Sequence, residues 1–496
     1  LGRNAPEPFQ KDSKQQTVVW DGKNDQGRYV HDKKRITVRV SLGLKPEYER
    51  SFLWSPYRRA GGNTPVICPA PEGVYVFEGS GFDHLRLFDH EGRYVRTIYP
   101  FPADKVDAVR GIKRHVMPQS GKDLPLKGGF YKATLLTSGY TGLSNSAQLP
   151  AGGAATLAMA VHKGRIFMPC LRLNRIGTDG TSGQMPLGGP RTAIPVQYNR
   201  WAEIIRKDVS PRSAAVSPDG KTLYFTGFGW DRGQDFGGFD WIDGVAQMDT
   251  LGNDPPRPFV CPPLKQGKDS AGTDNTHFRQ PMSVACDAQG RVYVADYGND
   301  RIQVFNPDGT HVKTIPVSRP TEVCINQKTG DIYVFSWLSA GRWTPDKSTP
   351  ASAGLDMSKL HVPAVMRHLG PLSDPREISS CPLPLPKYVD LGHFYNRFGG
   401  VTYRAALDSW TDPPTIWLVP GAAEMPTGYS VKLTWKQAGI LVLTEKDGKL
   451  VAKRDFGREA AKALPHLKPP ISQRQRLHVN PKTGMLYVAE GDNTIE

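Results

Sequence analysis

The chain contains a repeated unit of four short predicted β-strands, which is clearest at residues 279–315. This segment reads RQPMSVACDAQGRVYVADYGNDRIQVFNPDGTHVKTI, and apolar and polar residues alternate along it. Alternation with a period of two residues indicates half-buried β-strands, and the turn sequences DAQG, YGND and NPDG separate four of them. The segment therefore predicts one four-stranded antiparallel sheet.

A second copy follows directly, and two tyrosines give the length of the repeat. Residues 319–337 read RPTEVCINQKTGDIYVFSW, and Tyr333 stands 40 residues (333 − 293) after Tyr293 in the same phase. An internal period of about 40 residues is the length of one blade of a β-propeller. Other copies begin at Ser210, Gln475 and Thr64, and weaker second strands occur at 164–168 and 415–419.

An aromatic residue marks the second strand of each copy, and seven such strands can be counted. They carry Tyr75, Phe167, Tyr224, Tyr293, Tyr333, Trp417 and Tyr487. We therefore expect an all-β fold, a β-propeller of seven blades. Six or eight blades remain open, because the 92 residues (167 − 75) between the first two aromatics are enough for a hidden blade.

These copies resemble NHL-repeat and YVTN-type β-propellers, and the matching segments cover about a third of the chain. The resemblance implies that residues 61–496 form the propeller. The copy at Gln475 stops after its second strand, so its outer strands would come from residues near the N-terminal end of the propeller or from a longer natural chain. Closure matters because an open propeller leaves unpaired sheet edges.

The first 60 residues differ from the repeats. They contain VVWDGKNDQGRYV and then RITVRVSLGL, which resemble the second half of the Ig-like module of flagellar-hook-capping and cell-surface proteins. We expect a partial Ig-like β module and a linker at 1–60. Asp21, Asn24 and Asp25 could bind Ca²⁺, but they lack the spacing of an EF-hand, and turn formation is the commoner role of such residues. No other cofactor or metal is expected, because HxH, HExxH and CxxC patterns are absent.

The charge of the chain points to anionic partners. The net charge is +15 and the pI is about 9.4, which favours acidic or sulfated glycans, nucleic acid or anionic lipid. The alternative is a solvated basic surface with no specific partner. We expect an anionic polysaccharide or a protein partner. No Lys/Arg-rich run or aromatic RNA-binding signature indicates nucleic acid, and no apolar run of about 18 residues indicates a membrane span. Leu1 is not an initiator Met, consistent with a removed leader, so we expect an extracellular, periplasmic or cell-surface protein.

Six cysteines are present, and their contexts differ. Cys68, Cys286 and Cys324 lie in apolar strand-like runs and are expected to be buried. Cys261 and Cys381 each precede a proline in a loop, and a disulfide between them is possible in an exported protein.

The repeat phase predicts which loops share a face. The innermost strand of each blade starts at the face where the second strand ends; we call this the start face, and the face of the DAQG and NPDG turns the turn face. Long insertions at 227–244, 262–278 and about 336–392 should lie on the start face. Long loops on one side of a rigid scaffold commonly carry function.

Arginines and aromatics on the start face predict recognition of an acidic sugar. Guanidinium groups pair with carboxylate or sulfate, and aromatic rings stack on sugar rings. The expected ligand-binding residues are Arg212, Arg279, Arg319, Arg474, Arg476, Trp230, Tyr297 and Trp337. The alternative role for each is structural: arginines that bridge blades and aromatics that pack under loops.

A secreted polysaccharide lyase or glycoside hydrolase is the second functional hypothesis. A lyase needs a base and an acid beside an arginine, and His277 and Tyr297 are the catalytic candidates. A glycosidase needs two carboxylates, which Asp231, Asp235 and Asp240 could supply. A binding or assembly propeller without turnover is the first hypothesis, because no catalytic constellation stands out in the sequence.

Overall fold

The computed structural model of the protein describes part of the chain. The described residues are 7–13, 15–24, 28–32, 34, 36, 55–57, 65–78, 84–102, 104–111, 114–118, 121–125, 158–200, 203–231, 239–266, 270–337, 364–384, 403–420, 439–463, 475–479 and 486–490. They divide into two compact units, of which Ser55–Pro469 is the larger.

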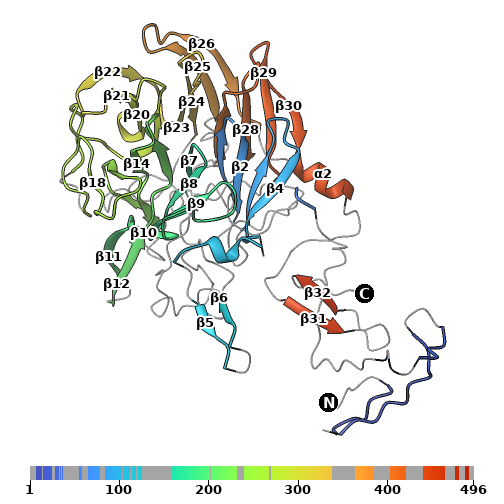
Figure 1. Ribbon diagram of the computed structural model, residues 1–496. Helices are drawn as coiled ribbons and strands as arrows, with labels where there is room; N and C mark the ends of the chain where they lie inside the picture. Colours follow the sequence, from blue (N-terminus) through green and yellow to red (C-terminus); the bar gives the residue numbers. More distant parts are fainter. Residues whose placement is uncertain are drawn as a thin grey trace. The chain divides into compact units, whose positions relative to one another are not determined.

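The larger unit contains six four-stranded antiparallel sheets among its described residues, each built from consecutive segments of the chain (Figure 1). Blade 1 contains β1 (Val66–Ala70), β2 (Gly73–Glu78), β3 (His84–Phe88) and β4 (Tyr94–Tyr99). Blade 2 contains β7 (Ala160–His162), β8 (Arg165–Pro169), β9 (Arg172–Gly177) and β10 (Gly188–Arg191). Blade 3 contains β13 (Ser213–Val216), β14 (Thr222–Thr226), β17 (Ala246–Asp249) and β18 (Arg257–Pro258).

The remaining three blades follow the same order from the innermost strand outward. Blade 4 contains β19 (Pro281–Cys286), β20 (Val292–Asp296), β21 (Arg301–Phe305) and β22 (His311–Pro316). Blade 5 contains β23 (Pro320–Ile325), β24 (Asp331–Ser336), β25 (Val365–Pro371) and β26 (Glu377–Pro382). Blade 6 contains β27 (Tyr403–Asp408), β28 (Thr415–Pro420), β29 (Leu441–Lys446) and β30 (Lys449–Asp455).

Shorter elements decorate the blades. The start-face loops carry the hairpins β11 (Ile194–Arg200) with β12 (Glu203–Val209) and β15 (Gly229–Asp231) with β16 (Phe239–Trp241). Residues after blade 1 form the 3-10 helix η2 (Val106–Ala108) and the pair β5 (Arg114–Val116) and β6 (Asp123–Pro125); η4 (Tyr297–Asn299) links β20 to β21, and α2 (Phe456–Ala463) follows β30. No helix among the described residues is long and apolar enough to cross a membrane.

A small residue faces the aromatic of each second strand, which explains why the repeat is readable in the sequence. The directly paired residues are Cys68 with Tyr75, Ala160 with Phe167, Ala215 with Tyr224, Ala285 with Tyr293, Cys324 with Tyr333 and Ala406 with Trp417. Residues paired across antiparallel strands point to the same side of the sheet, so a large ring needs a small neighbour there. Each of these six aromatics is buried.

The ring closes by packing between blade 6 and blade 1. Buried apolar clusters join each blade to the next, and the one at the closing seam combines Val76 and Phe88 of blade 1 with Trp417 of blade 6 and Phe456 of α2. The innermost strands β1 and β27 are also in contact. In Figure 1 the blue strands of blade 1 accordingly lie beside the red strands of blade 6.

The expectation of seven blades is wrong, because six sheets already complete the ring. The copy at Gln475 forms only a pair of strands, β31 (Gln475–Val479) and β32 (Leu486–Glu490), and these belong to the smaller unit. Tyr487 therefore lies in a second strand, as expected, but outside the described propeller. Blades 1 and 6 each have four strands of their own, so closure needs none from elsewhere.

Two further expectations concern the N-terminal segment and the cysteines. Among described residues before 58, only a bridge between Lys23 and Tyr29 forms around the WDG turn, and the Ig-like module remains a prediction. The Asp21 carboxylate accepts a hydrogen bond from Lys23 N (2.9 Å), which is turn chemistry. The suggested Cys261–Cys381 disulfide is wrong: all six cysteines, all within the described residues, are free thiols, and these two pack in different clusters.

Candidate functional site

The innermost strands place four polar side chains at equivalent positions near the start face. Ser213, Ser283, Glu322 and Arg404 each stand two residues before the small residue that pairs with the second-strand aromatic. Ser213 Oγ lies 3.3 Å from Ser283 Oγ, and Glu322 Oε2 accepts a hydrogen bond from Ala405 N (2.7 Å). This polar layer links blades 3 to 6 around the centre of the propeller.

Arg404 connects opposite sides of the ring. Its Nη1 donates to the carbonyl oxygen of Arg212 at 2.7 Å and lies 3.9 Å from Glu322 Oε1. Arg404 belongs to blade 6 and Arg212 precedes β13 of blade 3, so two blades lie between them in either direction around the ring. A propeller has a central channel, and the Arg404 guanidinium therefore bridges this one close to its start-face end. In the sequence, Arg404 resembles any other strand residue, because its partners come from distant segments.

Two residues at the start of neighbouring blades adopt the left-handed conformation. Gln280 and Arg319 have φ values of 52° and 48°, and each directly precedes a proline that begins an innermost strand. This conformation is costly for a non-glycine residue, and proline further restricts the residue before it. Carboxylates hold both backbones: Gln280 N donates to Asp243 Oδ1 and Arg319 N donates to Asp300 Oδ1, each at 2.7 Å.

The predicted arginines do lie at the starts of innermost strands, but their surroundings differ. Arg279 is exposed and Arg319 is half-buried, and neither guanidinium has a hydrogen bond or ion pair in the described part of the protein. Arg212 is buried against Gly227, whose added Cβ would meet Arg212 Cγ at 2.1 Å. Arg476 lies in β31 without a described side chain, and Arg474 lies outside the described residues.

The predicted aromatics are mostly buried. Trp337 is 1% exposed and packs against Tyr403 with ring centres 5.6 Å apart, so its indole offers no open face to a ligand. Tyr297 is 8% exposed and packs with Trp241 and Met282. Trp230 lies in β15, and its side chain is outside the described set.

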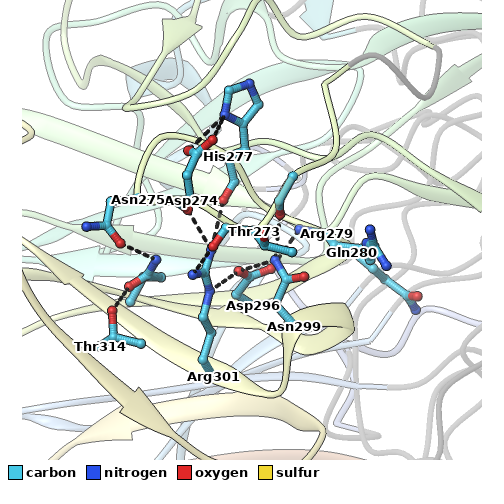
Figure 2. A network of polar contacts seen from close by, with 12 residues as sticks. Thr273, Asp274, Asn275, His277, Arg279, Gln280, Asp296, Asn299, Arg301 and Thr314 are labelled. Atoms are coloured by element: carbon cyan, nitrogen blue, oxygen red, sulfur yellow. Dashed lines mark hydrogen bonds and ion pairs between the residues drawn. The ribbon is translucent and has the colours of Figure 1, made fainter.

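His277 belongs to a polar network that holds the insertion before blade 4 (Figure 2). Its Nδ1 lies 2.9 Å from both carboxylate oxygens of Asp274, and this contact holds the pKa of Asp274 well below its usual range. Arg301 anchors the same loop by donating to the carbonyl oxygens of Thr273 (2.6 Å), Asp274 (2.7 Å) and His277 (3.1 Å). In Figure 2 the imidazole and the Arg279 side chain point away from each other.

Asp296 is the buried centre of this network. It is 0% exposed, and its carboxylate accepts hydrogen bonds from Arg279 N (2.7 Å), Asn299 Nδ2 (2.8 Å) and Arg301 Nε (2.7 Å). Burial raises the pKa of Asp296 above its ordinary value, and the three donors oppose that shift. The carboxylate thus fixes the backbone of Arg279, whose guanidinium has no partner among the described residues.

The structure describes two of the three acidic candidates and part of the predicted insertions. Asp231 and Asp240 pair with Phe239 and Trp230 in the β15–β16 hairpin, whereas Asp235 lies outside the described residues. The stretch 336–392 includes the outer strands β25 and β26 of blade 5. Among described residues, no group of three His, Cys, Asp or Glu side chains is arranged to hold a metal ion.

Six four-stranded sheets that close into a ring make the chain a β-propeller protein. The comparisons with known proteins agree with that fold. Residues 192–337, which run from before β11 to the end of β24, match the family model described as the SMP-30/Gluconolactonase/LRE-like region. NHL-type repeats are consistent with this match. No curated protein matches the chain.

Several solved structures are similar in fold. A Bacteroides caccae protein of unknown function is 12% identical, with 76% of this chain and 92% of that one covered and a TM-score of 0.34. AztD of Citrobacter koseri is 11% identical, with coverage of 79% and 86% and a TM-score of 0.34. Virginiamycin B lyase of Staphylococcus aureus is 12% identical, with coverage of 74% and 94% and a TM-score of 0.31. At these scores the likenesses carry no argument about function.

Proposed function

We propose that this protein is a secreted or cell-surface β-propeller that binds an acidic glycan through the start face of blades 4 and 5. The observation that carries the proposal is that the guanidinium groups of Arg279 and Arg319 have no partner within the described ranges of the chain. Carboxylates hold their backbone N–H groups at 2.7 Å, but no described side chain neutralises their charge. Guanidinium groups bind carboxylate and sulfate through two parallel hydrogen bonds.

The binding role is favoured over catalysis by the direction of the side chains. A ligand held by Arg279 would lie away from the His277 ring, because the two point apart in Figure 2. The net charge of +15 adds a long-range attraction for polyanions that salt should weaken. An acidic segment of a protein partner would use the same arginines and is the competing ligand class.

The test is a binding panel of a polyuronate, a sulfated glycosaminoglycan, a neutral dextran and an acidic peptide. We expect the two acidic glycans to bind, and R279Q/R319Q to weaken that binding at least about tenfold. R376Q is the matched control, because Arg376 is 81% exposed in the turn between β25 and β26 on the turn face. Equal loss in both variants would show charge attraction without a site, and binding of the peptide alone would favour a protein partner.

A glycan lyase is a second candidate, favoured by the Asp274–His277 pair. A carboxylate on Nδ1 orients an imidazole so that its other nitrogen can act as a base, and His277 Nε2 has no partner among the described residues. The same glycans should then yield unsaturated products absorbing at about 235 nm, as general acid–base elimination produces. Binding without product, or product that survives H277A, would exclude this candidate.

A further inference from the structure

The seam between the last blade and the first is bridged by a histidine. His90 lies in the turn between β3 and β4, and its Nδ1 is 2.8 Å from Asp408 Oδ2 at the end of β27. Its Nε2 is 3.0 Å from the carbonyl oxygen of Pro71. Asp408 is 0% exposed and the His90 side chain is 21% exposed, so this contact is a partly buried link between blade 1 and blade 6.

The partners of His90 reveal its protonation state. A carbonyl oxygen only accepts hydrogen bonds, and so does an ionised carboxylate, whereas a neutral imidazole has a single N–H. The imidazolium form satisfies both contacts at once. A proton placed on Asp408 instead would also satisfy them, and the pair would hold the same number of protons. Loss of that proton leaves one ring nitrogen facing an acceptor with no hydrogen between them.

A second histidine occupies the other seam of blade 6. His368 of β25 in blade 5 has Nε2 3.4 Å from Asp331 Oδ2 and Nδ1 3.3 Å from Glu445 Oε2, the latter on β29 of blade 6. Its ring stacks on Tyr333 with centres 4.2 Å apart. Both nitrogens again face carboxylate acceptors, and the His368 side chain is only 15% exposed.

The other charged groups near His90 do not remove its preference for the imidazolium form. Beside His90, the Glu91 carboxylate favours the imidazolium, while Arg93 is occupied by Asp89 at 2.7 Å and Glu91 at 3.1 Å. Lys328 acts on Asp408, and its Nζ donates to the carbonyl oxygen of Trp410 (3.1 Å).

His368 has charged neighbours of both signs. Its chain neighbour Arg367 lies 3.6 Å from Glu377, which offsets that cation. The carboxylates of Asp331 and Glu445 are the charged groups in contact with the His368 ring in the described part of the protein.

We propose that blade 6 is held against blade 1 by a protonated histidine, His90, so that closure of the propeller at this seam weakens when His90 loses its proton. Burial opposes the charged form of His90, but the hydrogen bonds to Asp408 and Pro71 outweigh it and raise the pKa of His90 above 6.5. A raised pKa in the folded state gives stability that is complete below the unfolded value and lost as pH rises through the folded value.

A third seam histidine provides the matched control. His162 lies between blades 2 and 3, where an added Cβ on Gly220 would meet its Cδ2 at 2.4 Å. It has no hydrogen bond or ion pair in the described part of the protein, and burial lowers its pKa. Protonation of His162 is therefore disfavoured by folding, and its effect on stability has the opposite sign.

The experiment is hydrogen exchange of the full chain at pH 6 and pH 8.5, corrected for intrinsic rates, with β20 of blade 4 as an internal reference. In the wild type we expect exchange in β27 and β28 to rise about tenfold relative to β20 at the higher pH, because stability from a group whose pKa is raised on folding is lost as pH rises. H90Q should exchange fast at both pH values, and H162Q should behave as the wild type. A wild-type ratio that does not change with pH overturns the proposal, and so does an unchanged pH response in H90Q. The wild-type measurement decides alone if H90Q does not fold.

Discussion

Replacing Asp296 with alanine tests whether buried charge organises the start face of blade 4. The carboxylate receives three hydrogen bonds, at 2.7, 2.8 and 2.7 Å, and one comes from Arg301, whose side chain is 11% exposed. Removing one member of a buried ion pair costs about 3–5 kcal/mol, because the remaining charge is left uncompensated. We expect a loss of that size, which is less than the sum of three separate charged hydrogen bonds because they share one carboxylate.

The assay is equilibrium unfolding in urea, which adds no ions, followed by tryptophan fluorescence. D274A is the matched control: Asp274 belongs to the same network, but its side chain is 62% exposed and Arg301 binds only its backbone carbonyl. An exposed ion pair is worth about 0–1 kcal/mol, so D274A should be nearly neutral. A D296A loss within about 1 kcal/mol of the D274A value would refute the reasoning.

Two other changes test the packing of the propeller. G227A should lower the melting temperature, because Gly227 has a φ of 78° and an added Cβ would meet Arg212 Cγ at 2.1 Å; G448A, with a φ of 68° and nothing within 4 Å, separates the backbone cost from the clash. Burial raises the pKa of Cys68 and of Cys324 to about 12. Both thiols should therefore react with a disulfide reagent at pH 8 about a thousandfold more slowly than in the unfolded chain. Unfolding without reductant should expose six reactive thiols, and fewer than six would mean that a disulfide is present. Burial also raises the pKa of Tyr224 from 10 to about 12. The stability that neutral Tyr224 contributes should therefore fall as pH rises above 10. An absorbance titration of the native protein that shows this tyrosine ionising at pH 10 would contradict its burial.

Much of the blade structure was predictable because it rests on local patterns. Alternating residues and turn sequences placed six of the seven proposed second strands correctly in blades, and the paired small residues belong to the same pattern. The start-face positions of Arg212, Arg279 and Arg319 followed from the repeat phase alone. The pattern did not predict that Trp337 is buried, because a residue just after a strand is equally suited to a loop or to the core beneath it.

The partners of the functional side chains could not be read from the repeat. Arg404 meets the carbonyl oxygen of a residue 192 positions away, and His90 meets a carboxylate 318 positions away. Asp243, Asp296 and Asp300 look like ordinary loop aspartates until their backbone donors are known. Such contacts depend on how separate blades are arranged, which local periodicity does not specify.

Local sequence specifies the four-stranded unit, its turns and the face on which its arginines begin, because these features depend on neighbours within about 40 residues. Packing in three dimensions closes the ring with six units, and the copy at Gln475 forms a strand pair in the smaller unit. The number of blades is set by the angle at which successive sheets pack, and that angle results from contacts among all the interblade clusters. The same packing brings acceptors from distant segments around His90, which is why its proposed charge is a property of the closed ring.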